Sequence, residues 1–448
     1  ATAAATLAAQ QAATTTAQVT TDLSTAAKTL KAALAAQAAA ATAAQLATAG
    51  STVTDGLSAN GLVVDPRVGT AAGTAANLWT NISQPVETTS SSNGTTTYTE
   101  TLTQTSQRAI ATWYKFNVGK NTTVYFNQSA GNTSSGNDWV VLNRIDATGV
   151  PSQIQGQIKA EGTVLLINPN GIVFSGSSQI NVHALIASSY DINSFTNCST
   201  NASSANCGVY ANGNGSYTVE TGTVNGQTVS FYAPNDETNG NSQYLDNGLY
   251  LNNSSTTLIL SASSGKDGSG NDLSSTILKN YGVTVQPGAT ISTLDNVSGF
   301  DNGGTVALVG PTVTNQGVIE TSAGQIILAS GSTLYLTEPT STSTSFTVTN
   351  YSPVKGSSLE YDPSGAVTGT TPTSIGVSGI TLNDTGAVLT SERGNITLVG
   401  DTVEQDGVAE ATTSVTRPGS ITITASGTTS FGSDSVTAIV SAENGETL

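Results

Sequence analysis

Residues suited to acid–base or nucleophilic chemistry are few in this chain. The single histidine, His183, follows an apolar strand-like segment, so we expect a structural or surface role for it. The sequence shows no Ser-His-Asp or Cys-His set, no zinc-protease motif and no phosphate-binding loop. Glycoside cleavage needs two facing carboxylates, but the candidate pairs Asp236/Glu237 and Asp267/Asp272 lie in Gly-, Asn- and Ser-rich segments without an aromatic platform. The sequence therefore predicts no enzyme, and a polysaccharide-active enzyme is kept as an alternative.

Metal ligands are also sparse. Asp267, Ser269 and Asn271 alternate in KDGSGND (266–272) like half of a calcium loop, but Leu278 stands where an EF-hand needs its bidentate glutamate. A solvated turn accounts for this segment equally well. We therefore predict no metal and no cofactor.

The two cysteines, Cys198 and Cys207, lie nine positions apart in the polar segment NCSTNASSANC. Pairing them would close a loop in an oxidising compartment, whereas two free thiols are the alternative. We predict the disulfide.

The composition is acidic, with 13 Lys+Arg against 30 Asp+Glu in 448 residues and a formal net charge of −17. Nucleic-acid binding needs clustered cations, so this balance excludes it as a predicted partner. No run of about 18 apolar residues is free of Thr, Gln or charge, so no membrane span is predicted. Because the chain has no Met, we expect it to start after a removed signal peptide.

The predicted secondary structure that must position any site changes along the chain. Residues 1–50 are rich in Ala, the strongest helix former, and predict a helical segment, with a frayed tail as the alternative. A linker (51–62) follows. Beyond it, short apolar strands recur between Gly, Asn, Asp and Pro turns, which predicts an all-β region.

An internal repeat indicates stacked coils. GTVALVGPTVTNQGV (304–318) aligns without gaps with GNITLVGDTVEQDGV (394–408), an offset of 90 residues that should cover several coils and an insertion. A single coil cannot bury its Val, Ile and Leu side chains, but the next coil can cover them. The sequence thus predicts a parallel β-helix, with polar insertions at 193–262 and 337–377 and hairpins at 84–105 and 215–232.

Two segments carry a family resemblance. QTSQRAIATWYKFNVGKNTTVYFNQ (104–128) and the stretch 139–189, which contains INPNGI (167–172), resemble the secretion domain of two-partner secretion exoproteins. This module is also called the haemagglutination-activity domain of filamentous-haemagglutinin-like adhesins. The resemblance covers about residues 61–192; a separate NPNL motif is absent, which leaves the subfamily open.

The resemblance implies a right-handed parallel β-helix solenoid, with a secretion domain at 63–192 and a shaft at 263–448. It also implies export through a cognate outer-membrane β-barrel transporter after periplasmic transit, and a secreted or cell-surface location. The expected function is that of an adhesin or structural exoprotein in attachment, aggregation or biofilm matrix. A host-cell or polysaccharide receptor is an expected partner, and a homo-oligomer or head-to-tail filament subunit is the alternative.

Candidate site residues follow from the same segments. Asn168, Pro169, Asn170 and Gly171 form a turn signature before Ile172, because Pro fixes φ while Asn and Gly accept positive φ. The turn either only permits coil folding or also contacts the transporter.

The rare cations Arg108 and Arg144 are the other candidates. Each either pairs with acids or carbonyls, or contacts the transporter. Five aromatic residues are predicted to fill the first coils rather than bind a ligand: Trp113, Phe116, Tyr125, Phe126 and Trp139.

Overall fold

The structure is a computed structural model in which two sets of residues are described. Backbone and side chains are described for 53–66, 68, 78–132, 139–145, 151–168, 170–190, 282–293, 304–322, 324–331, 379–413 and 419–441. The backbone alone is described for 133, 136–137, 191–192 and the strands of the insertions named below. The predicted helical segment (1–50), both cysteines and the calcium-like segment (266–272) lie outside the described residues.

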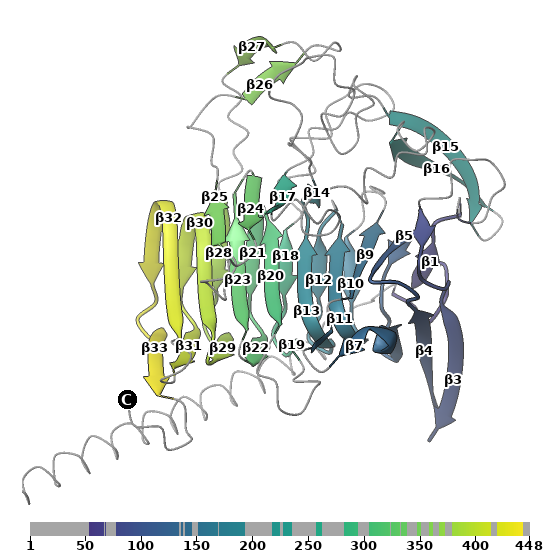
Figure 1. Ribbon diagram of the computed structural model, residues 1–448, viewed down its shortest axis with the longest axis horizontal. Coiled ribbons are helices and arrows are strands. Elements are labelled where there is room, and N and C mark those ends of the chain that lie inside the picture. The colour runs from purple at the N-terminus through teal and green to yellow at the C-terminus, as the bar shows by residue number, and fades with distance from the viewer. Residues whose placement is uncertain are drawn as a thin grey trace, which may run out of the picture.

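Most described strands belong to one sheet that coils into a parallel β-helix with three faces (Figure 1). The first face comprises β10 (Ser152–Ile154), β12 (Ile172–Phe174), β18 (Val283–Val285), β21 (Thr312–Asn315) and β28 (Ile380–Asn383). The second comprises β4 (Thr95–Thr103), β6 (Thr122–Asn127), β19 (Thr290–Thr293), β22 (Val318–Ser322), β29 (Val388–Glu392), β31 (Val408–Thr413) and β33 (Val436–Ser441). The third comprises β5 (Arg108–Phe116), β9 (Val140–Ile145), β20 (Thr305–Gly310) and β23 (Gln325–Ser330).

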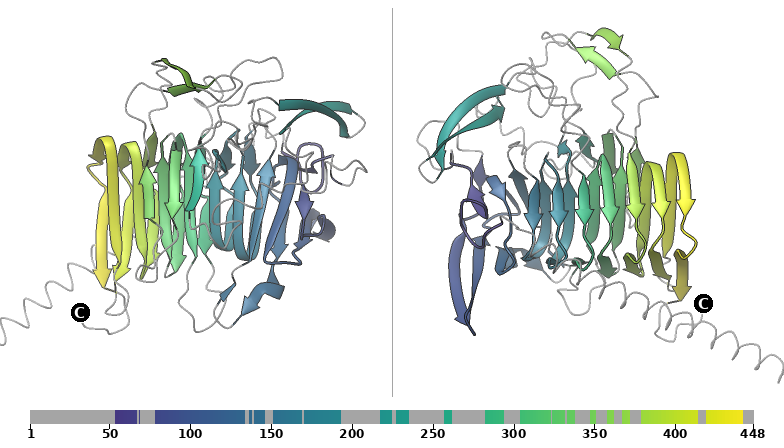
Figure 2. Two further views of the ribbon diagram at one scale, coloured as in Figure 1. Left: turned by 45° about the horizontal axis from the view of Figure 1, so that its top comes forward. Right: turned by 180° about the vertical axis from the view of Figure 1, so that it is seen from behind.

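Four long strands bend from one face to the next and tie the faces together. β11 (Gln157–Ile167) and β13 (Gln179–Ser188) run from the second face to the third, and β30 (Asn395–Gln405) and β32 (Ser420–Phe431) run from the third to the first. The coils follow one another along the long axis of the molecule (Figures 1 and 2). The predicted parallel β-helix is confirmed.

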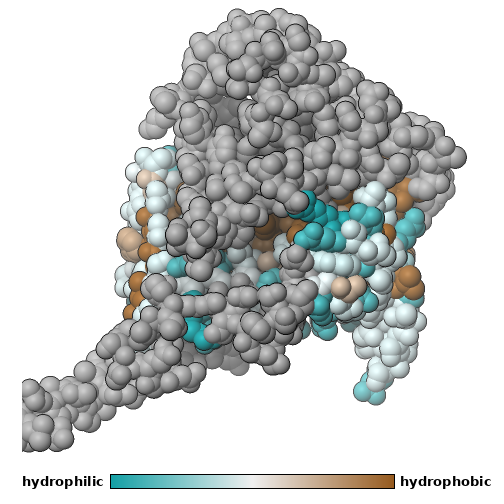
Figure 3. All heavy atoms as spheres, viewed as in Figure 1, coloured by the Kyte–Doolittle hydropathy of each residue, from teal (hydrophilic) through white to brown (hydrophobic). Residues whose placement is uncertain are grey.

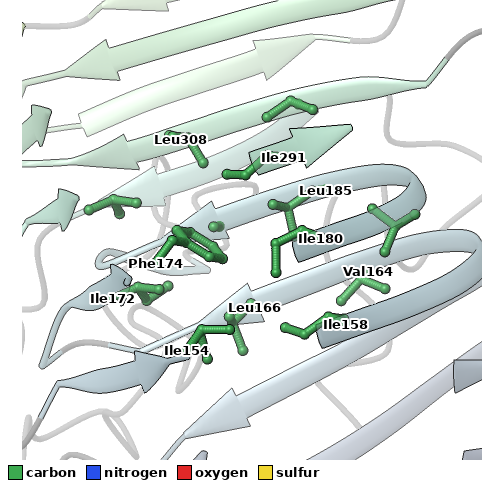
Figure 4. Close-up of a cluster of buried hydrophobic side chains, with 14 of the residues drawn as sticks. Ile154, Ile158, Val164, Leu166, Ile172, Phe174, Ile180, Leu185, Ile291 and Leu308 are labelled. Atoms are coloured by element: carbon green, nitrogen blue, oxygen red, sulfur yellow. The ribbon is translucent and has the colours of Figure 1, made fainter. Parts of the chain in front are cut away.

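The interior is a set of apolar ladders along this axis (Figure 4). On the third face, one ladder runs through in-register partners, all of which are buried except the last, Ile421, which is partly exposed. Its members are Val141, Val164, Leu185, Val306, Ile326, Ile396 and Ile421. The residues that alternate with this ladder on the same strands are also mostly apolar and buried, among them Leu165, Ala307 and Ile327. Within the interior, each coil covers the apolar side chains of its neighbours and keeps them from water.

The internal repeat corresponds to strands two coils apart. Leu308 pairs with Leu328, which in turn pairs with Leu398, and the second insertion accounts for the rest of the offset. The repeated glycines Gly304 and Gly394 begin these strands where the backbone of the preceding coil passes closely. A Cβ at Gly304 would lie 1.4 Å from the His183 carbonyl oxygen, so only glycine fits.

A buried amide ladder replaces apolar residues at one corner of the shaft. The Asn315 side chain donates to Asn383 Oδ1 at 2.9 Å, and Asn383 donates to Gln405 Oε1 at 2.8 Å. All three residues are 0% exposed. A buried amide is tolerated where its donors and acceptors are paired, and here the next coil supplies the partner.

The hairpin predicted at 84–105 is confirmed. β3 (Val86–Ser92) pairs antiparallel with β4, and the turn residues Asn93 and Gly94 have φ values of 51° and 78°. Positive φ at both central positions matches the twist of a two-residue hairpin. The pairing of β15 (Tyr217–Val224) with β16 (Gln227–Pro234) also confirms the hairpin predicted around 215–232.

Both long insertions leave the shaft at the same corner. The chain leaves the third face after Ser188 and returns to the first face at Val283; it leaves again after Ser330 and returns at Ile380. Strands from the two insertions join in one antiparallel sheet: β14 (Asp191–Ile192), β17 (Thr257–Ser261), β24 (Thr333–Thr337) and β25 (Thr347–Asn350). The remaining small pairs are β7 (Asn132–Thr133) with β8 (Gly136–Asn137), after the 3-10 turn Ser129–Gly131, and β26 (Ser358–Tyr361) with β27 (Val367–Thr371).

The two ends of the described shaft differ. At the N-terminal end, β1 (Leu62–Val64) and β2 (Trp79–Thr80) pair antiparallel with β5, and β3 covers β4. At the C-terminal end, β32 and β33 pair only with the preceding coil among the described strands. Phe431 and Ile439 of this coil are 58% and 52% exposed, and some of the brown hydrophobic atoms visible in Figure 3 lie at this end. Among the described strands, the N-terminal end of the shaft is thus covered and the C-terminal end is uncovered.

Truncating one interior aromatic should weaken the shaft strongly. Phe174 is 0% exposed and lies in register between Ile154 and Val285. Phe174→Ala is expected to lower the free energy of unfolding by about 3–5 kcal/mol, because the neighbouring coils cannot close the cavity. Urea unfolding measures this change. Val173→Ala, on the outward face of the same strand, should change it by less than about 1 kcal/mol; equal losses for both variants would contradict the assignment of the faces.

Candidate functional site: the turn at residues 168–171

The turn connects the end of β11 at Ile167 with the start of β12 at Ile172, as the sequence predicts. Asn168 accepts at Oδ1 from the Asn170 backbone N–H at 2.9 Å and from the Asn170 side chain at 2.8 Å. Its own amide donates to Ser152 Oγ of the preceding coil at 2.9 Å. Gly171 has φ of 98°, the conformation for which glycine is suited. One asparagine side chain thus organises the turn and ties two coils together.

Backbone hydrogen bonds fix the same turn to both neighbouring coils. The Asn168 N–H donates to the Ser188 carbonyl oxygen of the following coil at 2.9 Å, and the Gly171 carbonyl oxygen accepts from the Ser152 N–H of the preceding coil at 3.0 Å. Asn168 and Asn170 are only 0% and 2% exposed. In the folded protein, neither side chain is accessible to a second protein.

The structure places only one of the two candidate arginines beside this turn. Arg144 pairs in register with Ile167, the last strand residue before the turn, and is 7% exposed. Arg108 starts β5 at the opposite end of the third face and is partly exposed. The two cations therefore do not form a single patch on the folded shaft.

An aromatic cluster fills the closed end of the shaft. Trp113 makes edge-to-face contacts with Trp79 and Phe116, at centroid distances of 5.1 and 5.2 Å. Its indole N–H donates to Asn143 Oδ1 at 3.0 Å, so the buried ring is fully paired. Sequence reasoning missed Trp79, although its apolar neighbours Leu78 and Ile82 could have indicated it.

The other predicted aromatic residues divide between the interior and the surface. Phe126 is buried, whereas Tyr125 and Trp139 are partly exposed. The Tyr125 hydroxyl contacts Glu161 Oε1. Partial burial and this carboxylate raise the pKa of Tyr125 to about 12, so the phenol stays protonated and can donate to the carboxylate.

A histidine and a tyrosine outside the turn, His183 and Tyr190, are packed against other parts of the shaft. Burial lowers the pKa of His183, whose backbone carbonyl lies against the next coil. Tyr190 is buried where the first insertion leaves the shaft, and its hydroxyl donates to the Gly331 carbonyl oxygen, where the second insertion leaves. This bond joins the bases of the two insertions.

Among the described residues, no group of three or more His, Cys, Asp or Glu side chains could hold a metal ion. Within the same part of the chain, none of the helices has the length and apolar character that crossing a membrane requires.

A family model decides the identity of the region around the turn. Residues 70–276 match the model of the TPS secretion domain. This region is a TPS secretion domain. The matched range contains the 168–171 turn and both arginines, and it extends past the boundary predicted at 192 into the first insertion. The family resemblance of the sequence is thereby confirmed.

Curated relatives match the chain over a short stretch. A heme/hemopexin-binding protein of Haemophilus influenzae strain Rd is 39% identical over 80 residues, which cover 18% of this chain and 8% of that protein. A second heme/hemopexin-binding protein of Haemophilus influenzae is 36% identical over 92 residues, covering 20% and 9%. The matched stretch thus spans less than a tenth of the length of these relatives.

Two of the solved structures that match the chain are secretion domains. The HMW1 secretion domain from Haemophilus influenzae is 17% identical with a TM-score of 0.40, covering 77% of this chain and 62% of that one. The filamentous hemagglutinin secretion domain is 12% identical with a TM-score of 0.32, covering 85% and 100%. Similarity at this level does not extend to the positions of single side chains.

Removing the organising asparagine should destabilise the secretion domain. Asn168→Ala removes the oxygen that accepts from the Asn170 backbone and side chain, and the amide that donates to Ser152 Oγ. Because each unpaired buried polar group costs about 1–3 kcal/mol, we expect a loss of about 2–4 kcal/mol in the free energy of unfolding. Urea unfolding reports it. The control Asn181→Ala, which faces outward on β13, should have almost no effect; a silent Asn168→Ala would show that the turn forms without its side-chain bonds.

Proposed function

We propose that this exoprotein is exported through a cognate outer-membrane β-barrel transporter and forms the base of an extended β-helical structure for attachment at the cell surface. The observation that carries the proposal is the match to the secretion domain on a shaft that is closed at its N-terminal end and open at its C-terminal end. A closed end gives folding a defined start. An open edge lets each later coil pair with the one before it.

The burial of the turn supports recognition by the transporter before the domain folds. Asn168, Asn170 and Arg144 are buried in the folded domain, so the transporter would contact them in the unfolded chain. Folding outside the cell then removes these residues from the transporter, and the chain cannot rebind. Export gains a direction from the free energy of coil stacking, without a nucleotide cofactor.

The relatives support the secretion role more than a particular ligand. Their names describe binding of heme and hemopexin, but the similarity covers only 8–9% of their length. We infer that the shared part is the secretion module, and that any receptor contact of this exoprotein lies elsewhere. The insertions are the candidates, because surface segments that leave a regular scaffold commonly carry recognition.

A head-to-tail filament is the second candidate function, and the structure weighs against it. Such a polymer needs a receptive edge at each end of the subunit. The edges of β4 and β5 at the N-terminal end are already paired with β1, β2 and β3. A polysaccharide-active enzyme finds no support in the curated relatives, whose names are those of binding proteins.

Deleting residues 104–189 from the complete exoprotein should abolish its appearance in the medium or on the cell surface when the transporter is present. The deletion removes β5 to β13, and with them the strand that β1 and β2 cover, the turn and both arginines. Immunoblots of cell and medium fractions measure export. Deleting 337–377 instead should leave export intact, since the coils on both sides of that insertion stack directly. Normal export of the first variant would contradict the proposal.

Binding measurements on the unfolded chain test recognition by the transporter independently of folding. The assay dilutes a urea-unfolded 53–192 fragment onto the immobilised periplasmic domains of the transporter. The Arg144→Gln fragment should bind at least about tenfold more weakly than the original fragment, because a charged hydrogen bond contributes about 1.5–3 kcal/mol. Arg108→Gln tests the second candidate in the same assay. Lys159→Gln, an exposed cation on β11, is the matched control. Unchanged affinity of both arginine variants would exclude them as transporter contacts.

The attachment role is tested by removing the second insertion, which lies outside the matched secretion domain. Deleting 337–377 should preserve export but reduce adherence of cells to their surface or to each other by at least about half. Flow-cell counting of attached cells measures this, with surface-exposed protein quantified by antibody in each strain. Full adherence of this deletion would exclude the second insertion as the attachment surface.

A further inference from the structure

A fully buried carboxyl group lies directly under the closed end of the shaft. Glu100 of β4 is 0% exposed, and neither of its carboxyl oxygens has a hydrogen-bond partner of good geometry among the described residues. Its in-register partner across the hairpin is Glu87 of β3. On the other side, Glu100 pairs in register with Val124 of β6, which is also buried. Two carboxyl groups therefore face each other where one of them has no access to water.

A short loop closes over this pair. The Leu57 N–H donates to Glu87 Oε2 at 3.1 Å, and the Gly56 N–H donates to Thr122 Oγ1 at 2.9 Å. Gly56 has φ of 66°, and a Cβ there would lie 2.6 Å from Glu87 Oε2 and 3.4 Å from Glu100 Oε1. The loop backbone thus rests against both carboxyl groups.

The remaining polar groups around the loop are already engaged. Asp55 accepts from the Asn121 backbone and side chain at 2.9 and 3.0 Å. Lys115 donates to the Ala59 carbonyl oxygen and to Asn60 Oδ1 at 3.0 and 3.3 Å, on the loop's opposite part. Tyr98 of β4 packs beside Gly56. None of the contacts described for Glu87 or Glu100 brings a cation to them.

Two ionised carboxylates in this position would be strongly unfavourable. A buried charge without a partner is costly, and a second like charge beside it adds to the cost. Burial and then the neighbouring Glu87 raise the pKa of Glu100 to about 8, from an ordinary value of 4.5. A single proton on Glu100 removes the repulsion.

We propose that Glu87 and Glu100 form a one-proton pair that fastens the 53–61 loop over the closed end, so that loss of the proton releases the loop. We call this pH-dependent closure of the 53–61 loop over the closed end the latch. Acid conditions hold it shut, and alkaline conditions loosen the covering loop while the coils below remain stacked. This inference concerns the folded chain and does not depend on the transporter or on attachment.

The direction of the pH effect follows from proton binding. The closed loop has a Glu100 pKa of about 8, whereas an opened loop returns Glu100 toward 4.5. The closed state therefore binds more protons between these values, and its advantage is largest below the lower one. The opening equilibrium should rise nearly tenfold per pH unit from about pH 5 to pH 7.5 and level off above about pH 8.

Hydrogen exchange of the full chain tests the latch. The amides of Leu62 and Gly61, which donate to loop carbonyl oxygens, should lose about 100-fold in protection from pH 5.5 to pH 7.5 after correction for the intrinsic exchange rate. Glu100→Gln, which keeps the shape but carries no charge, should show less than about a threefold change. Glu87→Gln should keep the pH dependence with a smaller amplitude, because burial of Glu100 is the larger cause.

Two controls distinguish a proton-driven latch from a general effect of surface charge and from a bound cation. Glu320→Gln, an exposed acid on β22, should behave as the original chain. Calcium or EDTA should leave the profile unchanged, and a shift with either would replace the proton by a cation and overturn the proposal. A wild-type slope retained in Glu100→Gln would overturn it as well. If circular dichroism shows that Glu100→Gln does not fold, Glu87→Gln takes its place. A pH dependence of exchange in Glu87→Gln equal to that of the original chain would then overturn the proposal.

Discussion

Every feature of this shaft depends on one constraint, which is that an apolar strand of one coil is kept from water only by the strand of the next. The ladder from Val141 to Ile421 runs through successive coils in register, and its members are buried as far as Ile396. The same stacking lets a buried amide ladder replace apolar side chains, since Asn383 finds its donor and acceptor in the adjacent coils. Stability is then a sum of neighbouring contacts rather than the property of a compact core.

The constraint makes the two ends unequal. A terminal coil has one uncovered face and one unpaired edge, and the protein covers the N-terminal one with antiparallel strands and the Trp79–Trp113–Phe116 cluster. This cover includes the short loop that rests on Glu87 and Glu100. Placing a carboxyl group in an otherwise apolar position makes the strength of the cover depend on a proton. The C-terminal coil leaves Phe431 and Ile439 exposed and is suited to receiving a further strand.

One corner of the shaft holds a short turn in one coil and long insertions in later coils. The 168–171 turn crosses it in four residues, while the two insertions leave and return at the same corner in later coils. Coil stacking does not require any particular length at a corner, because only the strands on either side must remain in register. This corner can therefore hold a buried four-residue turn in one coil and long insertions in others, and the Tyr190–Gly331 bond joins the bases of these insertions.

The sequence by itself determined the fold class, the secretion-domain family, the hairpins of β3–β4 and β15–β16, and the bounds of the Asn168–Gly171 turn. Alternating patterns and turn residues are local, so they can be interpreted without knowing which strands meet. Only the tertiary structure decided that the turn is buried, that Arg144 lies beside it while Arg108 does not, and that Glu87 and Glu100 face each other. It also decided that Gly304 and Gly394 are two coils apart. These relations depend on register between coils, and insertions of unequal length remove any fixed period from which register could be inferred.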